Sequence, residues 1–138
     1  NIEYEVVEKL SNLAENYDVG ELVNNYLSKN TRKVAKILNE NNYSNEDCLL
    51  ILRTLLNKSK RLMKIIQNFD QGITIDSAIS NIKPPIFWKE KESLKTQISL
   101  WKLGDIKNKI YQINELETKI KSNSNNSLNL ISDFIVNY

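Results

Sequence analysis

The chain has 138 residues, of which 41% are hydrophobic and 26% charged, and its net charge is +2 at pH 7. This length suits one domain with a single core, and only three glycines and two prolines leave too few turn signals for an all-β fold. The net charge is far below the basic excess of a typical nucleic-acid-binding domain. We therefore expect an all-α fold, a single compact helical domain of about 7–8 helices around one long central helix.

The first fifteen residues are assigned to a different region from the rest of the chain. Residues 1–15 predict an amphipathic helix, which we interpret as a lead-in from a missing N-terminal region. The only methionine is Met63, so we expect the chain to be a fragment of a longer protein. Residues 16–138 then form its C-terminal helical domain.

Two short helices follow the lead-in. Asp18 caps a helix over residues 19–28, and Asn30 or Thr31 caps the next one, whose apolar pattern fades at 39–42. These helices alternate with polar corners, and no heptad pattern persists. The arrangement favours an orthogonal helical array over a coiled coil.

Residues 44–72 predict the long central helix, which we call the spine. Ser44 can act as its N-cap with Asp47 three residues later, and Gly72 supplies the stop. Cys48 lies on the apolar face and is interpreted as a reduced, packed thiol without a catalytic role. That face repeats at steps of three and four, through Cys48, Leu52, Leu55, Ser59, Leu62, Ile66 and Phe69, widened by Leu49, Leu56 and Met63.

The other faces of the spine carry basic residues that admit two interpretations. A solvated face is favoured, because these side chains do not form one clean stripe. The alternative is a docking surface for a partner. The residues are Arg53, Lys58, Lys60, Arg61 and Lys64.

After the spine, residues 73–82 predict a short helix capped by Thr74 or Asp76, which the proline pair at 84–85 ends. Because proline is well tolerated at the first helical position, the second proline can start the next helix, over residues 86–103. One face of that helix is apolar and is expected to pack into the core. It carries Phe87, Leu94, Ile98 and Trp101.

Leu103, Gly104 and Asp105 predict a tight corner, with Asp105 as the cap of the following helix. A polar loop at residues 122–127 separates that helix from a last one over 128–137. The helix after the corner carries Ile106, Ile110, Ile113, Leu116, Glu117, Ile120 and Lys121.

Trp88 lies away from the apolar face of its helix and near Lys91 and Lys95. An exposed tryptophan beside cations suits a protein interface, so Trp88, Lys91 and Lys95 are candidate interface residues. The alternative, that Trp88 covers the edge of the core beneath the proline pair, stays equally open.

The sequence offers no residue set for catalysis, a cofactor or a metal. Histidine, the commonest general base and metal ligand, is absent, and there is no phosphate-binding glycine loop. The carboxylates of Glu90 and Glu92 are two residues apart and point in different directions, as do those of Glu115 and Glu117, so both pairs are interpreted as solvated surface. Without a membrane-length apolar run or a secretion signal, we expect a soluble, cytoplasmic protein.

Residues 82–103, IKPPIFWKEKESLKTQISLWKL, combine a proline pair, an aromatic and basic run, and a glutamine before a tryptophan. Further on, Glu117 stands four residues before Lys121. In these features the chain resembles the C-terminal region of the delta subunit of bacterial DNA polymerase III, a clamp-loader component, in its alphaproteobacterial form. The matching residues are Pro84, Pro85, Phe87, Trp88, Lys89, Lys91, Gln97, Trp101, Glu117 and Lys121.

The resemblance implies that residues 16–138 are a collar domain, which packs beside gamma or tau and delta-prime subunits in a clamp loader for DNA replication. From the missing catalytic residues we expect no catalysis by this fragment, although the resemblance implies a parent subunit that belongs to the DNA-directed DNA polymerase holoenzyme. The sliding clamp would be bound only through missing N-terminal domains, and DNA only indirectly. The alternative function is a helical nucleic-acid-binding module that uses the basic residues of the spine.

Overall fold

The computed structural model describes residues 19–41, 43–82, 90–122 and 126–136, and within them every regular element is helical. The all-α prediction is confirmed, whereas the lead-in helix over residues 1–15 lies outside the described residues. A helix covers residues 19–27. It is followed by α2 (Thr31–Glu40), α3 (Asn45–Asp70), α4 (Ile75–Ser80), α5 (Lys91–Leu100), α6 (Leu103–Ser122) and α7 (Ser127–Val136).

Local signals set both ends of α3, the predicted spine. The N–H of Asp47 donates to Ser44 Oγ at 3.1 Å, and the N–H of Ser44 donates to Asp47 Oδ2 at 2.9 Å. This capping box satisfies two of the donors that a helix start leaves unpaired. Gly72 follows the other end with φ at +92°, a conformation that favours glycine. Its 26 residues give α3 a length of about 39 Å.

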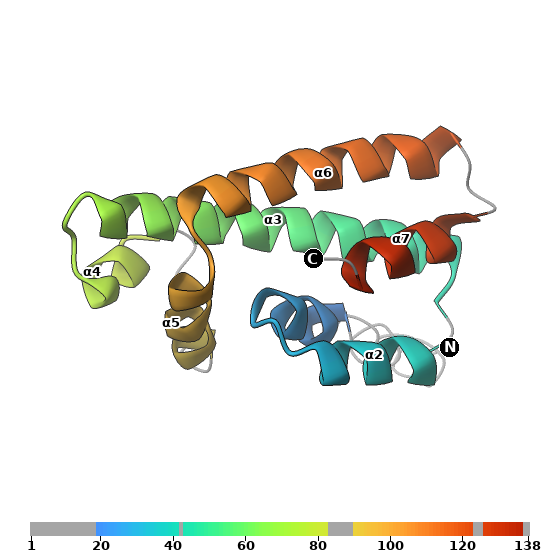
Figure 1. The fold of residues 1–138 in the computed structure, drawn as a ribbon, viewed down its shortest axis with the longest axis horizontal. Helices are drawn as coiled ribbons and strands as arrows, with labels where there is room; N and C mark the ends of the chain where they lie inside the picture. Colours follow the sequence, from blue (N-terminus) through green and yellow to red (C-terminus); the bar gives the residue numbers. More distant parts are fainter. Residues whose placement is uncertain (1–18, 42, 83–89, 123–125, 137–138) are drawn as a thin grey trace, which may run out of the picture.

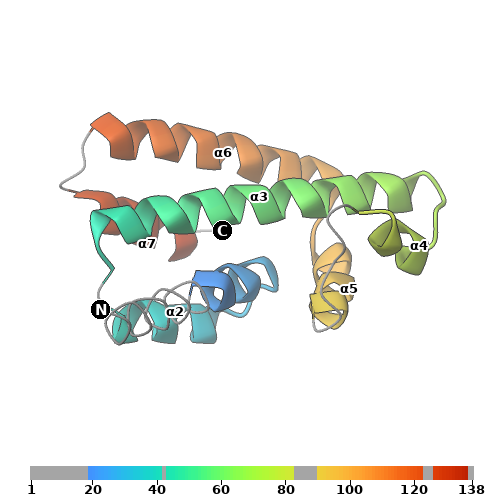
Figure 2. The same cartoon turned by 180° about the vertical axis from the view of Figure 1, so that it is seen from behind.

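Helices α4, α5, α6 and α7 pack against α3, and α2 packs against α7 (Figure 1). α6 runs back along most of α3 in the opposite direction, and α7 lies beside the first half of α3. α4 and α5 pack near its end. The view from behind shows the helix over 19–27 and α2 on the side of α3 opposite to α6 (Figure 2). The spine therefore has neighbours on several sides, as its broad apolar face requires.

The buried face of α3 differs from the predicted one at three positions. Ile51 and Ile65 are fully buried, although the prediction left them out. Phe69 is 41% exposed, so its assignment to the buried face is wrong. Helices on several sides widen the covered arc enough to include Ile51 and Ile65, whereas Phe69 lies in the last turn, where α3 gives way to the turn at Gly72.

The connection between α5 and α6 lies earlier than predicted. α5 ends at Leu100, and Gly104 and Asp105 belong to the first turn of α6, so the corner predicted at 103–105 is wrong. Trp101 is extended instead, with φ −116° and ψ 128°. This extended residue ends the helix and leaves the indole buried in the core.

On α6, Lys109 is buried, whereas Ile110 is only half-buried. The predicted core positions Leu94 and Ile98 of α5 are confirmed as buried. In α4, Thr74 is the N-cap, since its Oγ1 accepts from the N–H of Ser77 at 3.3 Å.

Candidate functional site

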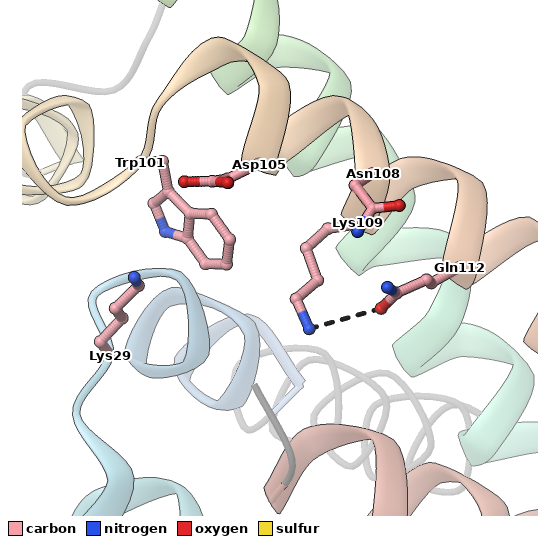
Figure 3. Close-up of a pocket in the computed structure, with 6 residues that line it drawn as sticks. All are labelled: Lys29, Trp101, Asp105, Asn108, Lys109 and Gln112. Atoms are coloured by element: carbon pink, nitrogen blue, oxygen red, sulfur yellow. Dashed lines mark hydrogen bonds between the residues drawn. The ribbon is translucent and has the colours of Figure 1, made fainter.

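The helix over residues 19–27 ends in a Schellman motif with a lysine where glycine is usual. The N–H of Asn30 donates to the carbonyl of Asn25 at 2.9 Å, and the N–H of Lys29 donates to the carbonyl of Tyr26 at 3.0 Å. Lys29 has φ at +57°, in the left-handed region. The helix end thereby places the Lys29 side chain beside the chain that follows α5 (Figure 3).

Gln97 and Trp101, two positions of the sequence motif, attach α5 to this helix end. Trp101 Nε1 donates to the carbonyl of Leu27 at 2.7 Å, and its side chain is buried. Gln97 is also buried, and its Nε2 donates to Asn24 Oδ1 at 2.9 Å and to Ser28 Oγ at 3.2 Å. Both motif residues therefore make long-range structural contacts within the chain.

Glu90 attaches the beginning of α5 to α3. Its Oε2 lies 3.0 Å from Arg61 Nη2, and its Oε1 lies 3.5 Å from Lys58 Nζ. The Glu90 side chain is 32% exposed, so its interpretation as solvated surface is wrong, whereas Glu92 at 87% is solvated. The two side chains differ in exposure because Glu90, just before α5, lies beside Lys58 and Arg61 of α3.

Glu117 is likewise half-buried rather than solvated. Its Oε1 lies 3.6 Å from Lys121 Nζ, four residues on, and 3.9 Å from Arg53 Nε on α3. Three of the five basic residues of the spine therefore pair with carboxylates, while Lys60 and Lys64 are exposed. These pairs interrupt the contiguous basic face that a nucleic-acid-binding module would need.

The structure describes two of the three candidate interface residues, and these two differ in their contacts. Trp88 lies outside the described residues, as do the motif positions Pro84, Pro85, Phe87 and Lys89. Lys91 is exposed at the first position of α5. Lys95 Nζ lies 3.5 Å from Asp76 Oδ1 of α4 and 3.7 Å from Glu92 Oε1, so it links α5 to α4.

A cavity of about 300 Å³ lies between the end of the 19–27 helix, Trp101 and the first half of α6. Lys29 and Lys109 reach it from opposite sides (Figure 3). Lys29 Nζ stands 4.5 Å from the centre of the Trp101 ring, a cation–π distance. The lining residues are Lys29, Trp101, Asp105, Asn108, Lys109 and Gln112.

Lys109 is 8% exposed, which is unusual for a lysine. Its Nζ donates to Gln112 Oε1 at 3.4 Å and lies 5.2 Å from the centre of the Phe134 ring. Burial, and then the nearby charge of Lys29, lower the pKa of Lys109 below its ordinary value. Among the described residues no carboxylate forms an ion pair with either lysine.

The sequence prediction missed both lysines of this cavity. A signal for Lys109 exists, because positions 106, 109, 113, 116 and 120 follow the helical spacing of a buried face, with lysine in an apolar position. Lys29 has a weaker signal, a helix end without glycine. Neither signal indicates that the two residues line the same cavity.

Other types of site find little support in the part of the chain that the structure describes. Cys48 is buried, and burial followed by the Asp47 carboxylate raises the pKa of its thiol, which fits a packed, protonated side chain. No cluster of metal-ligating side chains occurs in the described ranges. Nor does any helix there combine the length and apolarity needed to cross a bilayer.

Comparison with known proteins yields no match to a family model, a curated protein or a solved structure. These comparisons therefore assign no family to the chain.

Proposed function

We propose that this chain is a non-catalytic helical scaffold that binds other protein subunits, and that its assembly is the collar of a bacterial clamp loader. Support for the clamp-loader assignment comes from the motif within residues 82–103 and the Glu117–Lys121 spacing. Support for a scaffold role comes from the way in which α5, the helix within that motif, is held by the rest of the chain.

The attachment of α5 at both ends is the observation that carries the proposal. Glu90 joins its beginning to Lys58 and Arg61 of α3, and Trp101 joins its end to the carbonyl of Leu27. A surface held in this way loses little conformational freedom when a partner binds, which favours affinity. The exposed Lys91, at the start of α5, is the described residue best placed to contact that partner.

Size-exclusion chromatography with light scattering tests the assembly. The chain is mixed at micromolar concentration with collar fragments of the gamma or tau and delta-prime subunits, and a mixed complex is expected. Lys91→Glu, and Trp88→Ala combined with Lys95→Glu, should weaken that complex while retaining the helical circular dichroism signal. Lys119→Glu is the matched charge-reversal control, because Lys119 lies at the far end of α6 from α5 (Figure 1).

Two outcomes count against the proposal. Unchanged affinity of the folded Lys91 and Trp88/Lys95 variants would remove the assigned interface. The second is failure to form a mixed complex, together with tight binding to duplex DNA that weakens steeply with salt. This result would favour a nucleic-acid-binding function over the scaffold function.

A further inference from the structure

The cavity beside Trp101 has a property that the scaffold role does not explain: the largely buried Lys109 lines it, and no carboxylate among the described residues forms an ion pair with this lysine. Lys109 is 8% exposed, yet its only hydrogen-bond acceptor among the described residues is Gln112 Oε1, at 3.4 Å and three residues further along α6. An ammonium has three donors and, when buried, normally pairs with a carboxylate. Within the described part of the chain, at least one of the three donors of Lys109 Nζ therefore has no protein acceptor.

A second cation stands on the opposite wall (Figure 3). Lys29 holds a left-handed backbone conformation that costs free energy for any residue other than glycine, and its Nζ lies over the Trp101 ring at 4.5 Å. Burial, and then the nearby positive charge of Lys29, lower the pKa of Lys109. Two cations and a single carboxylate, Asp105, line this cavity, and this balance of charge favours an anion there.

The remaining polar residues of the cavity narrow the choice of anion. Asn108 and Gln112 bring amide groups, which can donate to oxygen, and Asp105 brings a carboxylate, which can only accept when ionised. The Asp105 charge repels an oxyanion that lacks a proton. It accepts a hydrogen bond from one that retains a proton, as hydrogen phosphate does and sulfate does not.

We propose that this cavity binds a phosphate group that carries a proton, with Lys29 and Lys109 neutralising its charge and Asp105 accepting its O–H. The cavity, at about 300 Å³, is larger than one phosphate ion, so it has room for water or for the organic part of a phosphate ester. The lining of this cavity includes neither Lys91 nor Lys95, the two interface candidates that the structure describes.

Isothermal titration calorimetry of the whole chain with inorganic phosphate tests the site, at an ionic strength held constant with potassium chloride. Saturable binding is expected, and it should weaken at least about tenfold in Lys109→Met and in Lys29→Gly. Both variants should stay folded, because methionine retains an unbranched apolar stem and glycine suits the left-handed backbone of residue 29. Lys107→Met, an exposed lysine on the same helix, is the matched control and should bind as the wild type does.

Sulfate and glycerol phosphate serve as comparison ligands in the same titration. Sulfate should bind more weakly than phosphate to the wild type, and Asp105→Asn should remove that difference. Binding of glycerol phosphate would identify an ester as the ligand, whereas binding of inorganic phosphate alone would identify the free ion.

Absence of saturable phosphate binding, or equal binding to wild type and the Lys29→Gly/Lys109→Met double variant, would overturn the site. Equal binding of sulfate and phosphate to the wild type would overturn the role of Asp105. Thermal unfolding of each variant in phosphate separates specific binding from the general stabilisation that kosmotropic anions give to all folded proteins.

Discussion

Replacing Trp101 with phenylalanine should destabilise the fold by breaking the contact between α5 and the end of the 19–27 helix. The indole N–H donates to the carbonyl of Leu27 at 2.7 Å, and both side chains are at least 95% buried. Phenylalanine keeps an aromatic ring at this position but has no donor. The Leu27 carbonyl would then be left without the partner that Trp101 supplies.

The expected loss has two main parts. Leaving a buried carbonyl unpaired costs about 1–3 kcal/mol. The smaller ring leaves a space whose cost is roughly 1 kcal/mol. The free energy of unfolding should therefore fall by about 2–4 kcal/mol, which for a chain of 138 residues corresponds to a Tm lower by roughly 6–14 °C.

Urea unfolding followed by circular dichroism measures this change, because the signal does not depend on the tryptophan that is removed. Tyr111→Phe is the control, since Tyr111 is 63% exposed and should change stability by less than about 0.5 kcal/mol. A Trp101→Phe loss within that same margin, at an unchanged m-value, would refute the role assigned to the hydrogen bond.

Three further predictions concern other contacts. Ser44→Ala should lower the free energy of unfolding by about 1 kcal/mol in urea titrations, because the N–H of Asp47 loses its capping acceptor. Ser44→Gly should lower it by only a few tenths of a kcal/mol. Equal losses in the two variants would contradict the capping role. Glu90→Gln should lower the free energy of unfolding by about 1 kcal/mol at low salt, since Lys58 and Arg61 lose their half-buried partner. Glu40→Gln, in an exposed pair with Lys36, should leave it almost unchanged. Equal losses would argue against the attachment of α5 to α3. The pKa of Lys109 in the folded chain lies below the ordinary lysine value of 10.5, so between these two pKa values the unfolded chain binds more protons than the folded chain. The stability of the wild type relative to Lys109→Met should therefore rise as the pH increases through the folded pKa towards 10.5. Denaturant titrations across this range should show that trend, and a constant difference would mean that Lys109 titrates as an exposed lysine does.

Features that depend on neighbours in the chain were predictable. The capping box at Ser44 and Asp47, the stop at Gly72 and most of the buried face of α3 follow from turn chemistry and the 3.6-residue period. The same period also predicted burial of Leu94, Ile98 and Trp101. These signals act over a few residues, so the pattern of residue types is sufficient to locate them.

The cavity and the attachment of α5 were not predictable in this way. Trp101 bonds to a carbonyl 74 positions away in the chain, and Glu90 meets Lys58 across 32 positions. Residue type showed that Trp101 has a donor and Glu90 a charge, but their partners depend on which helix faces meet.

The sequence by itself determined the all-α class, both ends of α3 and most of the apolar face of α3. Only the tertiary structure decided that Lys29 and Lys109 reach one cavity, and that half-buried carboxylates pair with three of the basic residues of the spine. The reason is physical: helix formation and capping are satisfied within a few residues, whereas burial, pairing and the interaction of charges depend on distances that are set when the helices pack.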